Sequence, residues 1–179
     1  KFFNIHENLG AKIVEFAGYL MPIQYTSIIA EHKAVRNSVG VFDVSHMGEI
    51  FVTGVKALDF VQHITVNDAS VLFPGRIQYS AMCYPDGGIV DDLLVYRIAE
   101  DKFMLVVNAS NIEKDFNWMR ENNKFSVELN NLSDDYSLLA IQGPKSKEVI
   151  QKICDKNLDL EYYYFFNAKI AGIEVIISR

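Results

Sequence analysis

Residues 77–108 constrain the fold more than any other stretch, because they read as three strands joined by two tight turns. The first turn lies at Pro85-Asp86-Gly87-Gly88, since an Asp-Gly pair supplies the positive φ angles of a two-residue hairpin loop. The predicted cross-strand pairs are Tyr84 with Ile89, Ala81 with Asp92 and Tyr79 with Leu94. The stretch therefore predicts an antiparallel meander around which the rest of the chain is arranged.

Two acids, Asp91 and Asp92, lie near the start of the second strand and must point to opposite faces, because side chains alternate along a strand. One predicted face carries Tyr79, Cys83, Val90, Asp92, Leu94 and Tyr96, and the other carries Ser80, Met82, Asp91, Leu93 and Val95. Strands disfavour aspartate, and a buried carboxylate needs a partner or a shifted pKa. At least one of the two acids is expected to face an apolar layer.

Residue type alone leaves two interpretations of these acids open. Both carboxylates could cap the hairpin end in water, or one could belong to a functional site, where perturbed acids are common. The neighbours of Asp92 favour a site, because Tyr79 lies diagonal to it and Tyr96 follows four residues later. An acid ringed by aromatic side chains suits a pocket for a flat heterocycle.

The rest of the chain alternates hairpins with single helices rather than strict β-α-β units. We expect strands or hairpins at 12–16, 42–53, 125–129, 136–142 and 168–178, and helices at 27–40, 57–64, 110–122 and 144–154. Thr26 or Ser27 can cap the first helix, Ser110 with Glu113 matches a capping box, and Pro144 suits a first helical position. This order predicts an α+β fold with largely antiparallel sheet.

Composition narrows the class of protein further. Half of the 179 residues are hydrophobic and 22% are charged, which suffices for one domain or two small entwined ones. A net charge of −6 without a Lys/Arg-rich stripe argues against a nucleic-acid partner. No apolar run approaches the roughly 20 residues that span a bilayer, so no membrane partner is expected.

Cysteine and histidine usage bears on compartment and on metals. Two thiols, Cys83 and Cys154, in a chain of this size favour a reduced cytosolic or matrix compartment over secretion. The four histidines lack the i,i+4 or Cys-x-x-Cys spacing of metal ligands, so no metal site is expected. They are His6, His32, His46 and His63.

Several longer segments, spread in order over nearly the whole chain, form a distributed pattern. They are HENLGAKIVEFAGYLMPIQY (6–25), AVRNSVGVFDVSHMGE (34–49), IQYSAMCYPDGGIVDDLLVY (77–96), FMLVVNASNIEKDFNW (103–118), LLAIQGPKS (138–146) and AGIEVIISR (171–179). Together they resemble the T-protein family, the aminomethyltransferases of the glycine cleavage system. The resemblance implies mixed, largely antiparallel sheets with flanking helices in two entwined subdomains, about 1–47 with 135–179 and an inserted 48–134.

The resemblance also implies that this chain is a portion of a longer one. Typical family members are about twice as long as this chain, which leaves room for a further domain of ordinary size. The C-terminal barrel domain that they carry is absent here. We expect residues 173–178 to pair within a sheet and Arg179 to lie near the surface. The segment alone is expected to be inactive.

The implied reaction moves the methylene of an aminomethyl group from the lipoylated H-protein to tetrahydrofolate, with release of ammonia. The resemblance implies that Asp92 corresponds to the family's key acid. It also implies that the folate pocket is lined by Tyr79, Tyr96, Met47 and Asn108, with Tyr163 as a further candidate. Tetrahydrofolate and the H-protein are the implied partners, without a metal, in a bacterial cytoplasm or a mitochondrial matrix.

The strand register of Asn108 stays open. A three-residue loop at 99–101 would place Asn108 opposite Asp92, and a two-residue loop would place it on the other face of the sheet.

Other functions on the same scaffold are weighed beside this one. One is the folate-binding portion of a dimethylglycine- or sarcosine-oxidising flavoprotein, although no upstream Gly-rich dinucleotide motif is visible. Another is a non-catalytic folate-binding protein of the iron–sulfur assembly type, although its Lys-Gly-Cys-Tyr-x-Gly-Gln motif is missing before Arg179. A plain α+β domain with an aromatic and acidic core is the simplest alternative, since fold alone does not establish activity.

Overall fold

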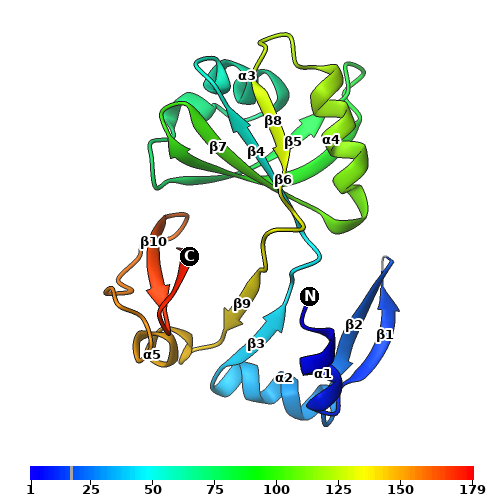
Figure 1. Ribbon diagram of the computed structural model, residues 1–179, viewed down its shortest axis with the longest axis vertical. Coiled ribbons are helices and arrows are strands. Elements are labelled where there is room, and N and C mark those ends of the chain that lie inside the picture. Colours follow the sequence, from blue (N-terminus) through cyan, green and yellow to red (C-terminus); the bar gives the residue numbers. More distant parts are fainter. Residues whose placement is uncertain (17) are drawn as a thin grey trace. The chain divides into compact units, whose positions relative to one another are not determined.

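The computed structural model describes residues 1–16 and 18–179 and confirms the predicted α+β class (Figure 1). The chain divides into two compact units. Unit 1 comprises Lys1–His46, Ser137–Leu158 and Ala168–Val175, and unit 2 comprises Met47–Tyr136, Asp159–Asn167 and Ile176–Arg179. Each unit is thus assembled from segments that are distant in sequence.

Unit 2 is built on an antiparallel sheet with the strand order β5-β6-β7-β4-β8 (Figure 1). Its strands are β4 (Gly48–Thr53), β5 (Ile77–Cys83), β6 (Ile89–Ala99), β7 (Lys102–Val107) and β8 (Glu128–Asn131). The predicted meander is therefore β5-β6-β7. The last strand begins at Glu128 rather than at residue 125, because Asn123 bonds both backbone groups of Val127 and so holds a loop there.

The register of the β5-β6 hairpin follows the prediction except at the turn. Tyr79 pairs with Leu94 and Ala81 pairs with Asp92, as expected. The predicted pair of Tyr84 with Ile89 is wrong, because a bulge between Met82 and Cys83 makes Cys83 the partner of Ile89. A bulge adds one residue to one strand and reverses the alternation beyond it. Val90 accordingly joins the buried cluster of Met82 and Leu93, not the face of Asp92.

The second turn resolves the position of Asn108. Ala99 pairs with Lys102, so the loop holds only Glu100 and Asp101. A register shift between Arg97 and Ala99 leaves Ile98 without a partner, and Leu93 then pairs with Val107. Asn108 is the residue after Val107, so it lies opposite Asp92, the residue before Leu93. A two-residue loop together with a bulge therefore gives the arrangement that we expected from a three-residue loop.

The sheet has an apolar core on each face. Helices α3 (Ala57–Ile64) and α4 (Ile112–Glu121) cover one face, where Phe60 and Met119 pack against the strands (Figure 1). The other face carries a smaller cluster of Phe51, Ile77, Tyr96, Met104, Val106 and Phe165. Helix α3 has the predicted bounds, because its buried residues recur with helical spacing.

Helix α4 begins differently from the prediction. A short 3₁₀ turn, η2 (Ala109–Asn111), precedes it, and the N-cap residue Asn111 makes no side-chain capping bond. The Asn111 amide donates instead to the Asp91 carboxylate, at 2.9 Å between Nδ2 and Oδ1. Tertiary contact with β6 therefore replaces the capping box. A second 3₁₀ turn, η1 (Ala69–Val71), follows α3.

Unit 1 contains shorter elements. They are α1 (Phe3–Asn8), β1 (Lys12–Phe16), β2 (Tyr19–Gln24), α2 (Ile28–Asn37), β3 (Gly40–Asp43), β9 (Leu139–Gln142) and α5 (Ser146–Gln151). Strand β1 pairs with β2 and β3 pairs with β9, both antiparallel. Ser27 caps α2 by accepting a bond from the Ala30 N–H at 3.1 Å. Helix α2 ends at Asn37, not at Gly40, because Gly40 already pairs with Gln142.

The imidazole of His6 joins three segments of unit 1. Its Nδ1 lies 2.7 Å from the Tyr25 hydroxyl, and its Nε2 lies 2.9 Å from Asp43 Oδ2. Since His6 is only 9% exposed, these bonds tie α1 to the segment after β2 and to β3.

Helix α5 is shorter than the predicted helix 144–154. It spans Ser146–Gln151, and its N-cap residue is Lys145 rather than a residue before Pro144.

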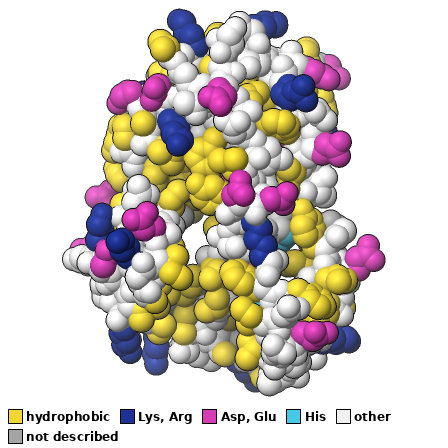
Figure 2. All heavy atoms as spheres, in the orientation of Figure 1, with side chains coloured by type: hydrophobic (Ala, Val, Ile, Leu, Met, Phe, Trp, Pro, Cys, Tyr) yellow, Lys and Arg dark blue, Asp and Glu magenta, His cyan; other side chains and the backbone are white. Residues whose placement is uncertain are grey.

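Strands β10 (Phe165–Ile170) and β11 (Ile173–Ser178) form the predicted hairpin. It turns at Ala171 and Gly172, which both have positive φ angles. Residues 173–178 thus pair within a sheet, and Arg179 is exposed, as expected. On the molecular face drawn in Figure 2, Lys and Arg side chains are dispersed among Asp and Glu.

Candidate functional site

Asp92 is exposed at one end of the sheet and is held by two side chains. Its Oδ2 accepts a hydrogen bond from the Tyr79 hydroxyl at 2.9 Å, and its Oδ1 accepts one from Asn108 Nδ2 at 3.1 Å. The bond to Asp92, together with that carboxylate's charge, raises the pKa of Tyr79. Tyr79 therefore stays protonated at neutral pH and donates to Asp92.

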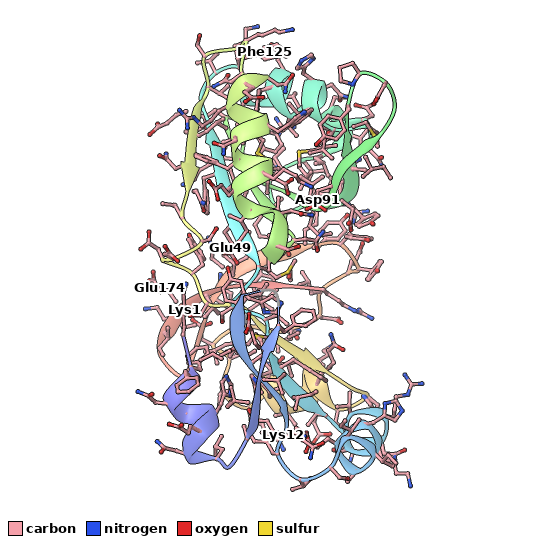
Figure 3. The ribbon with its side chains drawn as sticks, turned by 90° about the vertical axis from the view of Figure 1, so that its right-hand side faces the viewer. Lys1, Lys12, Glu49, Asp91, Phe125 and Glu174 are labelled. Carbon is pink, nitrogen blue, oxygen red and sulfur yellow. The ribbon has the colours of Figure 1, made fainter. Side chains whose placement is uncertain are left out.

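Asp91 faces the opposite way and is buried. It accepts bonds from the Asn108 backbone N–H, from Asn108 Nδ2 and from Asn111 Nδ2, at 3.3, 3.0 and 2.9 Å. Burial acts to raise the pKa of Asp91, but the neighbouring Asp115 carboxyl and the hydrogen bonds from Asn108 and Asn111 outweigh it and hold that pKa below its usual value. The expectation that one acid faces an apolar layer is confirmed, and that acid is Asp91. Figure 3 labels Asp91 beside α4, whose N-cap residue Asn111 bonds to it.

A third acid, Asp115 on α4, was not predicted. Its side chain is fully buried, and burial together with the neighbouring Asp91 carboxylate raises its pKa to about 8. The Lys114 ammonium lies 3.8 Å from Asp115 Oδ1 but donates its bond, at 2.6 Å, to the Val90 carbonyl. The sequence did carry a signal, because Asp115 lies three residues after Ile112 and four before Met119, on the apolar stripe of the helix.

Replacing Asp115 with asparagine is expected to flatten the pH dependence of stability. Between the usual pKa of 3.8 and the folded-state value of about 8, the folded chain binds more protons than the unfolded chain. The free energy of unfolding therefore falls as pH rises through this window, by at most about 1.4 kcal/mol per pH unit. Asparagine does not titrate, so this part of the slope should disappear.

Urea unfolding at several pH values within that window measures the slope. Asp101→Asn is the matched control, since it removes a carboxylate from an exposed turn of the same sheet, and its slope should equal that of the parent chain. A slope that Asp115→Asn leaves unchanged would mean that Asp115 is ionised at neutral pH.

An open pocket of about 510 Å³ lies beside Tyr79. It is lined by Val71, Leu72, Phe73, Arg76, Ile77, Gln78, Tyr79, Tyr163 and Tyr164. The Arg76 guanidinium stacks 4.1 Å from the centre of the Tyr164 ring and donates to the Tyr162 carbonyl at 3.3 Å. Aromatic walls beside a fixed cation suit a ligand that combines a flat ring with an anionic group. Arg76 and Tyr164 were not predicted.

The structure places the six predicted site residues in different surroundings. Asp92, Tyr79 and Asn108 are in hydrogen-bond contact, and Tyr163 joins Tyr79 in the pocket lining. Tyr96 is only 7% exposed and shares a hydrogen bond with Ser178, at 3.1 Å between the two hydroxyl oxygens. Met47 packs against the same apolar cluster as Tyr96, and neither side chain lines the pocket.

The described residues contain neither a group of metal ligands nor a helix that could span a membrane. Among residues 1–16 and 18–179, no group of three or more His, Cys, Asp or Glu side chains could hold a metal ion. Within the same residues, no helix is long and apolar enough to cross a membrane.

Comparison with known proteins gives a consistent picture. The model of the family described as "GCVT N-terminal domain" matches residues 2–179. A protein named aminomethyltransferase from Halothermothrix orenii is 56% identical over 178 residues, which are 99% of this chain and 50% of that protein. Another of that name from Flavobacterium psychrophilum is 56% identical over 172 residues, 96% of this chain and 48% of that protein. This chain thus spans about half the length of these curated relatives.

Solved structures agree on the fold. The glycine cleavage system aminomethyltransferase T from Bartonella henselae superposes with a TM-score of 0.89 at 35% identity, covering 94% of this chain and 46% of that one. A heterotetrameric sarcosine oxidase from Corynebacterium sp. U-96 superposes with a TM-score of 0.61 at 16% identity, covering 84% of this chain and 76% of that one, which shows a shared fold alone.

Proposed function

The chain belongs to the family of GCVT N-terminal domains, and from this premise we propose that it supplies the tetrahydrofolate site of a glycine cleavage aminomethyltransferase. In the proposed reaction the folate amine attacks the methylene of an aminomethyl group carried on the reduced lipoyl arm of the H-protein. The methylene is transferred to tetrahydrofolate, ammonia leaves, and the dihydrolipoyl arm is regenerated. The cytoplasm is the proposed compartment, because the aminomethyltransferases compared above are bacterial.

The position of Asp92 is the observation that carries this proposal. The carboxylate is exposed, and its two oxygens are fixed by the Tyr79 hydroxyl and the Asn108 amide. An ionised carboxylate held in this way can accept a hydrogen bond from the folate amine, orient its lone pair and stabilise the positive charge that develops as ammonia leaves. We assign Asp92 as the catalytic residue.

The pocket beside Tyr79 supports folate as the acceptor. Tyr79 and Tyr163 offer flat apolar surfaces, and the Arg76 guanidinium offers a partner for a carboxylate. Tetrahydrofolate combines a flat heterocycle with carboxylates. Tyr96 and Met47 then support the floor of this site from the apolar cluster rather than as pocket lining.

The proposal is tested with the gene-encoded protein. Purified protein, lipoylated H-protein charged with the aminomethyl group, and tetrahydrofolate should yield ammonia and methylene-tetrahydrofolate in equal amounts. Calorimetry should detect tetrahydrofolate binding without the H-protein. Binding of folate without transfer would favour the non-catalytic folate-binding alternative, and the absence of both would overturn the proposal.

Replacing Tyr79 with phenylalanine is expected to lower turnover by about three- to tenfold. The ring stays in the pocket, but one of the donors that orient Asp92 is lost, and a typical solvent-exposed hydrogen bond contributes a net free energy of about 0.5–1.5 kcal/mol. Steady-state kinetics with both substrates measures the change. Tyr84→Phe is the matched control, because it removes a hydroxyl from the same hairpin at a residue with no part in the site, and its turnover should be unchanged.

A further inference from the structure

We propose that Asp91 and Asp115 form a carboxyl pair that shares one proton and positions the Asn108 amide against Asp92. Asp91 and Asp115 are thus positioning residues, which act through Asn108 rather than on the substrate. The effect on turnover rests on the proposed function, whereas the pair itself does not depend on it.

The surroundings of Asp115 require a proton donor within the pair. Asp115 is fully buried, and in the described part of the chain no N–H or hydroxyl donor lies within hydrogen-bond distance of either carboxyl oxygen. Asp91, which is 6% exposed, is the neighbouring carboxylate. It accepts a bond from Asn111, one helical turn before Asp115, and the Lys114 ammonium lies within 3.8 Å of Asp115 while it donates to the carbonyl of Val90, the residue before Asp91. Two adjacent buried carboxylates cannot both be ionised without a large penalty, so one must hold a proton and donate it to the other.

The surroundings of Asp91 identify it as the ionised partner. Asp91 accepts from the Asn108 backbone N–H and from the side-chain amides of Asn108 and Asn111, and all of these groups are donors. A carboxylate can accept several such bonds, but a protonated acid has less acceptor capacity. The proton therefore resides on Asp115, in agreement with its pKa of about 8.

The pair fixes the orientation of the Asn108 side chain. The same Nδ2 lies 3.0 Å from Asp91 Oδ1 and 3.1 Å from Asp92 Oδ1. An amide rotated by 180° would present its carbonyl oxygen to both carboxylates, which repel it. As long as Asp91 is an acceptor in this place, the Asn108 NH₂ group points toward Asp92. Asn111 adds a second bond between β6 and the start of α4.

Ionisation of Asp115 should loosen this arrangement. The groups with charge that face Asp115 are Asp91 from β6 and the Lys114 ammonium from α4 itself. Lys114 is exposed and is engaged with the Val90 carbonyl, so it does not replace the lost proton. Above pH of about 8 the two carboxylates repel each other, and the hold on Asn108 weakens.

The pair is tested by NMR on the gene-encoded protein labelled in its aspartate carboxyls and asparagine amides. We expect one carboxyl carbon to titrate near pH 8 and the Asn108 side-chain NH₂ signals to shift with the same midpoint. Both changes should vanish in Asp115→Asn, and the midpoint should fall in Asp91→Asn. In the wild-type protein, a carboxyl titration and an Asn108 shift with the same midpoint decide the proposal even if a variant fails to fold. The proposal is wrong if no carboxyl titrates above about pH 6, or if the chemical shifts of the Asn108 NH₂ group do not change as the carboxyl titrates.

Turnover provides a second measurement. Asp91→Asn should lower kcat by about three- to tenfold, with the KM for tetrahydrofolate within about twofold, because orientation rather than binding is lost. In Asp115→Asn the ratio of kcat at alkaline and neutral pH should rise relative to the parent enzyme. Asp101→Asn should match the parent in both measurements. Unchanged kcat in Asp91→Asn would overturn the positioning role, whereas a wild-type enzyme without any transfer would refute the proposed function and leave the NMR result to decide the pair.

Discussion

Replacing Asp92 with asparagine is expected to lower turnover by about tenfold or more while leaving tetrahydrofolate affinity within a few-fold. Asparagine keeps the size of the side chain and can still accept a bond from the Tyr79 hydroxyl, which lies 2.9 Å from Asp92 Oδ2. It removes the negative charge that would stabilise the developing cation. Single-turnover assays with preloaded H-protein separate the chemical step from substrate binding.

Two comparisons make this measurement specific. Asp101→Asn removes the same charge from the exposed β6-β7 turn and should not change turnover. Asp91→Asn should lower turnover less than Asp92→Asn, because Asp91 points away from the pocket side of the sheet. Full activity in Asp92→Asn would exclude a catalytic role for this carboxylate.

Replacing Gly143 with alanine is expected to destabilise unit 1 by about 3 kcal/mol or more, since strain and overpacking each cost about 1–3 kcal/mol. Gly143 has a φ of +127°, a conformation that side-chain-bearing residues rarely adopt. A Cβ atom there would lie 2.6 Å from the Val35 carbonyl oxygen, 2.9 Å from Val39 Cα, and closer still to the Ser38 carbonyl oxygen. These contacts are with backbone, which cannot move aside as a flexible side chain can.

Thermal and urea unfolding followed by circular dichroism measure this loss. Gly10→Ala is the matched control, because Gly10 also has a positive φ, of +76°, but nothing lies within 4 Å of the position that a Cβ atom would take there. Its cost should be about 1 kcal/mol, from the backbone conformation alone. Equal losses in the two variants would show that the close approach at residue 143 is relieved by movement of α2.

Elements with strong local signals could be predicted from the sequence. Helix α3 has the expected bounds because its apolar residues recur every three to four positions, and the Asp-Gly turn placed Asp91 and Asp92 on opposite faces correctly. Asp92 and Tyr79 could be placed together because hairpin register follows from turn position.

Features that depend on tertiary contacts could not be predicted in this way. The bulge near Met82 turns Val90 to the other face of the sheet, and Ile98 has no partner on β7. Neither irregularity can be recognised from the types of the residues involved. Helix α4 lacks its capping box because Asn111 bonds to Asp91 instead, a contact between residues that are distant in sequence. Asp115 was missed because polarity normally indicates the solvent-facing side of a helix, and here a neighbouring acid rather than water is its partner.

The unpaired Ile98 bears on where the chain can change in length. Arg97 pairs with Phe103 on one side of it and Ala99 pairs with Lys102 on the other, so deleting Ile98 would close the ladder without moving any other pair. Deleting a residue between Asp92 and Arg97 would instead turn Asp92 to the opposite face, away from Tyr79. Insertions and deletions in this hairpin are therefore compatible with the site only at its turn end, on the far side of Arg97 from Asp92.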